Sequence, residues 1–307
     1  MPTRNTHAAN TVTIAAENSH ESRLRHALCA LRDRSSPCIS RWYRSSMFPL
    51  FDAFLALPAV VIMLCVVMFW GTVAISVHRV IVPYLCGADG KKLVKFEAEV
   101  TSQIAVAFGL LLSFNAVWVW DRGDRVNHAV VDEALALATA LDDSESMLTA
   151  EQSQQTRLAV GNYAHFLVEQ EWPTLNDAHA VRTRPAELIA LRKCARVTGD
   201  ADLIDAVDAA ETAREVRIRD GLAYMSPPRW IVVILLAILL LISIGALHGD
   251  APRGRKLALT LVALAVSFCF CVLLLHARPF VGQFAIRPTE LQAIIARLDT
   301  MNTTAAQ

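Results

Sequence analysis

Four long uncharged segments interrupt an otherwise polar sequence. Each holds about 18 to 25 residues, and an α-helix needs roughly 20 apolar residues to cross the hydrocarbon core of a bilayer. The pattern therefore predicts four transmembrane helices, at about residues 53–77, 101–120, 230–247 and 257–275. The first segment is close in sequence to the second, and the third is close to the fourth, whereas a longer stretch separates the second from the third. We therefore expect two transmembrane hairpins, over residues 47–120 and 230–276.

The polar segment between the hairpins, residues 121–229, has the pattern of a helical domain. Apolar side chains recur at helical spacing from about residue 124 to residue 144. Thr149 and Gln152 have the spacing of a capping box, which opens a helix that Pro173 would stop. The predicted fold class is therefore an all-α membrane protein, with four transmembrane helices in two hairpins that flank a cytoplasmic helical domain.

The two ends of the chain have different patterns. Residues 1–46 are polar and rich in arginine, which predicts a solvated tail; the alternative is a basic helix that lies on a membrane surface, because three leucines share one helical face. Residues 277–307 form a C-terminal tail that ends in a predicted amphipathic helix. Its apolar stripe is expected to pack on the helical domain and consists of Leu291, Ile294, Ile295 and Leu298.

Composition agrees with a membrane protein and excludes several functions. The chain is 54% hydrophobic and 19% charged, with a formal net charge of zero, so no bulk attraction to nucleic acid is expected. Its seven cysteines form no CxxC pair, and its nine histidines are scattered. We therefore expect no metal, no cofactor, no catalytic residue and no enzymatic activity, with the lipid bilayer as one certain partner.

Lysine and arginine near the ends of the predicted spans indicate the orientation. About twelve lie on the side that carries both termini and the helical domain, against about seven on the other side. Positive residues are more frequent on the cytoplasmic side of a membrane. This bias predicts a multi-pass protein of the cell (inner) membrane with both termini in the cytoplasm.

One face of the second span is a candidate pore lining. The side chains that share this face are Ile104, Phe108, Leu111 and Asn115, and Arg122 continues it beyond the membrane edge. Around a rotation axis the face would form an apolar constriction that leads to a ring of arginines, which favours anions. The alternative is that the stripe faces lipid or packs on other helices, while Arg122 pairs with Asp121 or Asp124.

Three motifs resemble the bacterial bestrophin-like domain family. They are VVDEALAL at residues 130–137, NYAHFLVEQEWPT at 162–174 and ARPFVGQFAIRP at 277–288. The resemblance implies a four-span helical fold with cytoplasmic termini and, by analogy, a ring-shaped homo-oligomer, a pentamer, that conducts anions such as chloride. The motif positions to which it points are Glu133, Tyr163, Glu171, Trp172, Pro173, Arg278, Pro279, Phe280 and Gly282.

These motif residues also have physical interpretations. Glu133 is expected to pair with an arginine such as Arg125 or Arg217, and Arg278 to extend toward the lipid headgroups. Pro279 and Gly282 would turn the chain back under the membrane. The predicted function is an oligomeric, anion-conducting ion channel. The alternative is a non-conducting membrane scaffold or sensor that works through its helical domain.

Overall fold

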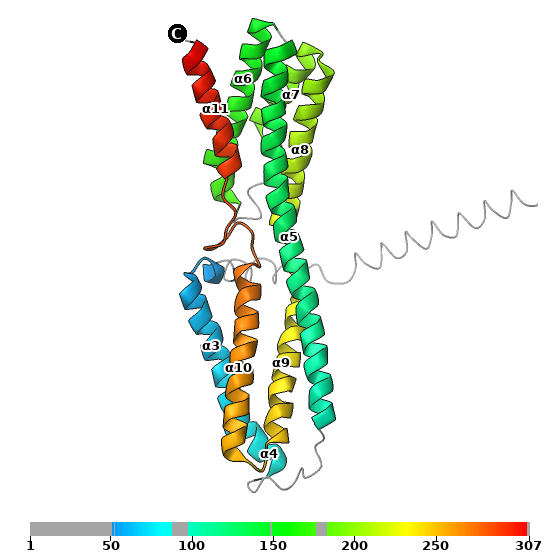
Figure 1. Ribbon diagram of the computed structural model, residues 1–307, viewed down its shortest axis with the longest axis vertical. Helices are drawn as coiled ribbons and strands as arrows, with labels where there is room; N and C mark the ends of the chain where they lie inside the picture. Colours follow the sequence, from blue (N-terminus) through cyan, green and yellow to red (C-terminus); the bar gives the residue numbers. More distant parts are fainter. Residues whose placement is uncertain (1–50, 52, 88–97, 148, 176–182, 306–307) are drawn as a thin grey trace, which may run out of the picture. The chain divides into compact units, whose positions relative to one another are not determined.

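The computed structural model describes residues 51, 53–87, 98–147, 149–175 and 183–305 (Figure 1). Every regular element within these ranges is a helix. The predicted N-terminal tail, residues 1–46, and the lysine-rich loop at 91–95 lie outside the described residues. Four of the helices are long and apolar enough to cross a membrane, as the sequence predicts.

The first span begins and ends later than predicted. Helix α3 covers Ala59–Ser76 and continues through a π-helix, η1 at Val77–Ile81, into α4 at Val82–Cys86. Pro58 has an extended conformation and stands as the N-cap, so the helix starts after it. His78 and Arg79 do not end the span, because apolar residues follow them for about another two turns.

The second span belongs to a much longer helix. Helix α5 runs without a break over the 50 residues Ala98–Met147, and therefore contains both the predicted span at 101–120 and the first helix of the polar domain. The change of polarity at Asp121 does not interrupt the helix. The third and fourth spans are α9 at Pro227–Leu247 and α10 at Pro252–Leu275.

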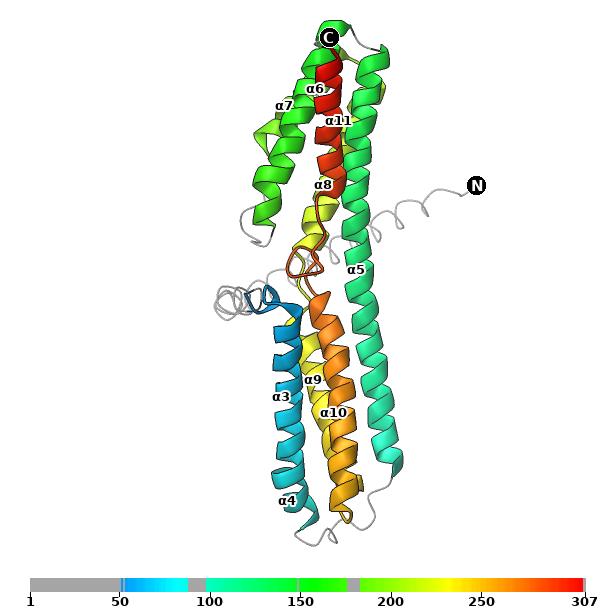
Figure 2. The same cartoon turned by 60° about the vertical axis from the view of Figure 1, so that its left-hand side comes forward.

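The spans pack around an apolar core. Helix α3 packs on α10, and α9 lies against both α5 and α10 (Figure 2). Trp70 of α3 is 1% exposed, and its ring centroid lies 5.1 Å from that of Phe270 on α10. Close packing of such side chains holds the helices of a membrane bundle together.

The second compact region is a helical bundle built around the C-terminal half of α5. Its other helices are α6 at Ala150–His165, α7 at Ala186–Thr198, α8 at Ala201–Gly221 and α11 at Thr289–Ala305. The capping box of Thr149 and Gln152 is present at the start of α6, as predicted. We call these helices, with residues 121–147 of α5, the polar bundle.

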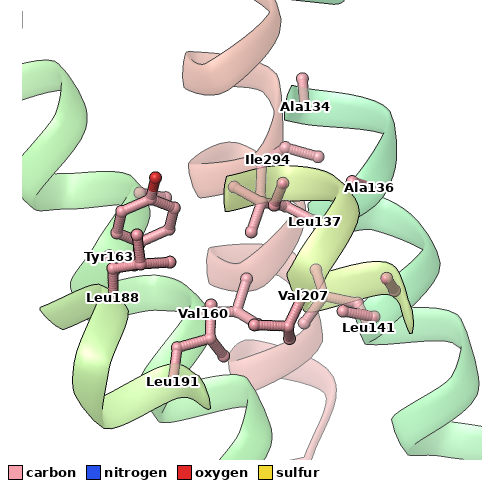
Figure 3. Packing of buried hydrophobic residues seen from close by; sticks show 14 of the residues in the cluster. Ala134, Ala136, Leu137, Leu141, Val160, Tyr163, Leu188, Leu191, Val207 and Ile294 are labelled. Carbon is pink, nitrogen blue, oxygen red and sulfur yellow. The ribbon is translucent and has the colours of Figure 1, made fainter. Parts of the chain in front are cut away.

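The core of the polar bundle confirms the expected position of the C-terminal helix. Ile294 of α11 packs against the cluster that contains Leu137 of α5 and Val160 of α6 (Figure 3). Leu291 and Leu298 of α11 are buried in the same cluster. The apolar stripe of the tail therefore closes the bundle.

Candidate functional site

A cluster of four buried charged side chains lies inside the polar bundle. Glu133 comes from α5, Arg214 and Arg217 come from α8, and Glu171 is the last residue of η2, a π-helix at Phe166–Glu171 that extends α6. Glu133 and Arg217 are 0% exposed, and their Oε2 and Nε atoms are 2.7 Å apart. The prediction that Glu133 pairs with Arg217 is thus confirmed, whereas Arg125 does not contact it.

Glu171 joins the two arginines. Its Oε1 accepts a hydrogen bond from Nη2 of Arg217 at 2.6 Å, and its Oε2 accepts one from Nε of Arg214 at 2.9 Å. Burial alone would lower the pKa of Arg217, but the neighbouring carboxylates of Glu133 and Glu171 raise it above its ordinary value. Two carboxylates and two guanidinium groups therefore balance in charge, which is the condition for burying such a cluster.

Two aromatic residues complete the cluster. The hydroxyl of Tyr163 donates a hydrogen bond to Oε1 of Glu133 at 2.8 Å, and burial together with that carboxylate raises the pKa of Tyr163 well above its usual value. The ring centroid of Trp172 lies 5.2 Å from the guanidinium carbon of Arg217. Pro173 follows in a short 3-10 helix, Trp172–Thr174, where the helical run ends as predicted.

The loop after the fourth span connects this cluster to the transmembrane helices. The ring of Phe280 stands edge-on to Trp172, with centroids 5.4 Å apart, and packs on Gly221 at the end of α8. The carbonyl of Pro279 accepts a hydrogen bond from the amide of Ile286 at 2.8 Å, which closes the loop. Gly282 has φ 91°, a left-handed conformation that favours glycine, so it turns the chain as expected.

The prediction for Arg278 is wrong. Its side chain does not extend to lipid headgroups but is 2% exposed, and its guanidinium carbon lies 4.1 Å from the ring centroid of Tyr224. The ring that covers it, that of Tyr224, belongs to the segment between α8 and α9.

The predicted pore-lining stripe faces the inside of the chain. Phe108 belongs to the core of the spans, and Ile104 and Leu111 pack against that core. Asn115 is 3% exposed, and its amide donates to the carbonyl of Leu111 at 3.0 Å. In the single chain, this face of α5 is therefore covered by the protein's own helices.

Arg122 also points inward. It is 1% exposed and donates hydrogen bonds to the backbone carbonyls of Ala223 and Ala277. Its guanidinium carbon lies 4.9 Å from the ring centroid of Trp118. Arg122 thus links α5 to the segments that join the spans to the polar bundle. In the described part of the chain, it pairs with neither Asp121 nor Asp124.

The opposite face of α5 is open. Its apolar side chains are Val106, Leu110, Phe114 and Val117, each at least 56% exposed. Between residues 121 and 132 of α5, the exposed charged residues are Asp121, Asp124, Arg125 and Asp132. Asp121 pairs with Arg125, and Arg125 also donates to Asp220 of α8 at 2.9 Å.

Neither Arg214 nor the open face was singled out from the sequence. Arg214 lies one turn before Arg217 on α8, so the spacing of two arginines on one helical face was the available signal. Among the described residues, no group of three histidine, cysteine, aspartate or glutamate side chains is placed to hold a metal ion.

Four apolar helices joined to a polar helical bundle define a multi-pass helical membrane protein. A family model described as the bestrophin-like domain matches residues 90–291, which contain all three motifs, at 130–137, 162–174 and 277–288. The chain therefore belongs to the bestrophin-like domain family, as its motifs indicate. Neither a search of curated proteins nor a search of solved structures gives a significant match.

Proposed function

We propose that the protein is an oligomeric ion channel and that the open face of α5 lines its conduction path. The observation that carries this proposal is the uneven cover of the spans. Only 17% of the apolar 18-residue stretch of α5 is buried inside the chain. The corresponding share is 28% for the first span and 39% for each of the last two. A span that is left open, and whose helix continues over residues 121–147 into the polar bundle, is suited to stand at a shared axis.

The open face has the composition of a hydrophobic constriction. Val106, Leu110 and Phe114 follow one another by one helical turn. Copies of this stripe around an axis would form successive apolar rings, and such rings gate ion flow by losing water. Small residues border the stripe at Ala105 and Gly109, where a neighbouring helix can approach closely.

The charges that follow the constriction favour cations. The expectation of an anion path was based on a ring of Arg122 side chains. The Arg122 side chain instead donates hydrogen bonds to backbone carbonyl groups of its own chain. Asp124 and Asp132 are exposed on the open side of α5, and the charge of Asp121 is offset by Arg125. Rings of carboxylates attract cations, so we propose a cation-preferring path in place of a chloride path.

Reversal potentials measured across a KCl gradient test both parts of this proposal. The purified protein, reconstituted in planar bilayers, should carry current. Its reversal potential should lie closer to the equilibrium potential of K⁺ than to that of Cl⁻. Replacing Asp124 and Asp132 by Asn should move the reversal potential toward that of chloride, whereas Asp205→Asn, an exposed aspartate on α8, should leave it unchanged. An anion-selective current would contradict the proposed selectivity, and absence of current at any voltage would contradict the channel.

A second candidate is a non-conducting scaffold or sensor. One observation favours it: α5 and the loop of Phe280 both link the spans rigidly to the polar bundle, so a change in the membrane would reach the bundle directly. A monomer in detergent would support this alternative, and a ring of copies, five by family analogy, would support the channel. The cytoplasmic placement of the bundle and termini stays a prediction from the lysine and arginine bias.

A further inference from the structure

A groove with apolar walls lies between α3 and α10. Its volume is about 460 Å³. The apolar lining includes Val67, Gly71 and Ile75 of α3 and Leu259, Ala263 and Leu264 of α10. One end is different in character, because it is formed by His78, Arg79 and Lys256. The groove is thus amphipathic along its length.

The two walls of the groove run antiparallel and in register. Val67 and Ser267 line one end, and His78 and Lys256 line the other. From Val67 to His78 the helix rises by about 16 Å at 1.5 Å per residue. This length is close to half of the ~30 Å hydrocarbon core, so the groove has the depth of one membrane leaflet.

The polar end lies at the tips of the spans, on the side of the α9–α10 connection and away from the polar bundle (Figure 1). Here η1 widens the helix at the turn that carries His78 and Arg79, and π-helical segments of this kind occur frequently at functional sites.

The charged side chains that line this end of the groove, Arg79 and Lys256, are both cationic. Arg255, Arg79 and Lys256 are the charged groups that act on His78. Nε of Arg255 donates a hydrogen bond to Nδ1 of His78 at 3.1 Å. Because Nδ1 accepts this bond, the imidazole proton resides on Nε2. His78 is therefore a hydrogen-bond donor beside the two cations of the groove lining, Arg79 and Lys256. The polar end therefore offers several donors and positive charges to one anionic group.

We propose that this groove binds an anionic phospholipid. One acyl chain would lie along the apolar walls, and the phosphate would be held by His78, Arg79 and Lys256. An inorganic anion would use the cationic end but leave the apolar groove empty. A second copy of the chain would have to place a carboxylate against the cations, and a zwitterionic lipid would bring a positive group close to them.

Gly71 allows the groove to be closed without disturbing the fold. A Cβ atom on Gly71 would meet no other atom within 4 Å, so a larger side chain there projects into open space between the walls. Gly123 of α5 is equally open and does not line the groove, which makes it a matched control. For the charges, Arg253 in the first turn of α10 is exposed and lies outside the groove lining, so it is the matched control.

The test is native mass spectrometry of the full-length protein in detergent, with phosphatidylglycerol, phosphatidylcholine or inorganic phosphate added at equal concentrations. Phosphatidylglycerol should be retained in preference to phosphatidylcholine. The double variant Arg79→Gln/Lys256→Gln should lose about tenfold in retention of the anionic lipid, since each cation near a membrane surface contributes substantially to such binding. Gly71→Leu should lose it to a similar extent, while Arg253→Gln and Gly123→Leu should retain it.

Four outcomes would overturn the inference. Equal retention of both lipids would remove the role of the charges. Loss in the charge variant without loss in Gly71→Leu, or full competition by inorganic phosphate, would assign the cations to a free anion. Unchanged lipid retention with a smaller oligomer in Gly71→Leu would assign the groove to a second copy. None of these outcomes depends on whether the protein conducts ions, so the inference and the proposed channel fail separately.

Discussion

Glu133 and Arg217 form an ion pair at 2.7 Å with neither side chain exposed to solvent. The pair joins α5 to α8, whose contact is the most extensive one between two helices of the polar bundle. Through Trp172 and Phe280 it is also connected to the loop that follows the fourth span. The helix that leaves the membrane is therefore locked to the bundle by charge as well as by apolar packing.

Glu133→Gln should destabilise the protein by about 3 kcal/mol, because removal of one partner leaves a buried charge without its counter-charge. The variant keeps the size of the side chain, so the loss reports on charge and not on a cavity. Thermal unfolding in detergent, followed by circular dichroism, measures the effect.

The control for this variant is an exposed pair on the same helix. Asp142 of α5 and Arg297 of α11 form an ion pair with side chains that are 62% and 36% exposed. Exposed pairs contribute about 0–1 kcal/mol, so Asp142→Asn should change stability little. If both variants unfold at the same temperature, the buried cluster has no special role in stability.

The sequence predicted the helices well because their apolar pattern and their caps are local. Thr149 and Gln152 could be recognised as a capping box, since both groups lie within one turn of chain. The sequence alone could not show whether Arg125 or Arg217 is the partner of Glu133. That choice depends on how α8 packs on α5, where Arg125 instead reaches Asp220.

The hydrophobic pattern could not predict which face of α5 is covered by other helices, for a different reason. Both faces of a transmembrane helix are apolar, so spacing shows that Phe108 and Asn115 share a face but not whether that face is covered. The same limit applies to Arg278. Its position after a span suggests extension to headgroups, and only the packing of the loop on Tyr224 buries it.

Gly282→Ala should cost about 1–3 kcal/mol of stability. The residue has φ 91°, and a Cβ atom there would lie 2.9 Å from the carbonyl oxygen of Leu55. The substitution therefore adds backbone strain and a clash at the loop between the fourth span and the bundle. Gly123→Ala is the matched control, because a Cβ there meets nothing within 4 Å and alanine favours the helix. Equal melting temperatures for the two variants would show that the turn tolerates a side chain.

Asp220 should contribute a small, pH-dependent part of the stability. Burial alone would raise the pKa of Asp220, but hydrogen bonds from Arg125 and Arg219 lower it below the ordinary value of 3.8. A carboxyl whose folded pKa is lowered stabilises the fold above the unfolded pKa, and this contribution is lost as the pH falls through the folded pKa. Asp220→Asn should therefore cost up to about 1 kcal/mol at pH 7. The difference from wild type should shrink as the pH falls below 3.8 and should vanish once the pH lies below the folded pKa of Asp220, and a difference that does not change with pH would contradict the assignment.

Phe114→Ala should increase the current carried by the reconstituted protein. Phe114 is 64% exposed on the open face of α5, where we propose that its ring narrows an apolar path. A smaller side chain widens the path and lowers the cost of wetting it, so single-channel conductance should rise several-fold. Phe69 of α3 is 51% exposed and serves as the control, because its face would meet lipid. Phe69→Ala should leave conductance unchanged, and an equal response of the two variants would mean that the open face of α5 does not line the path.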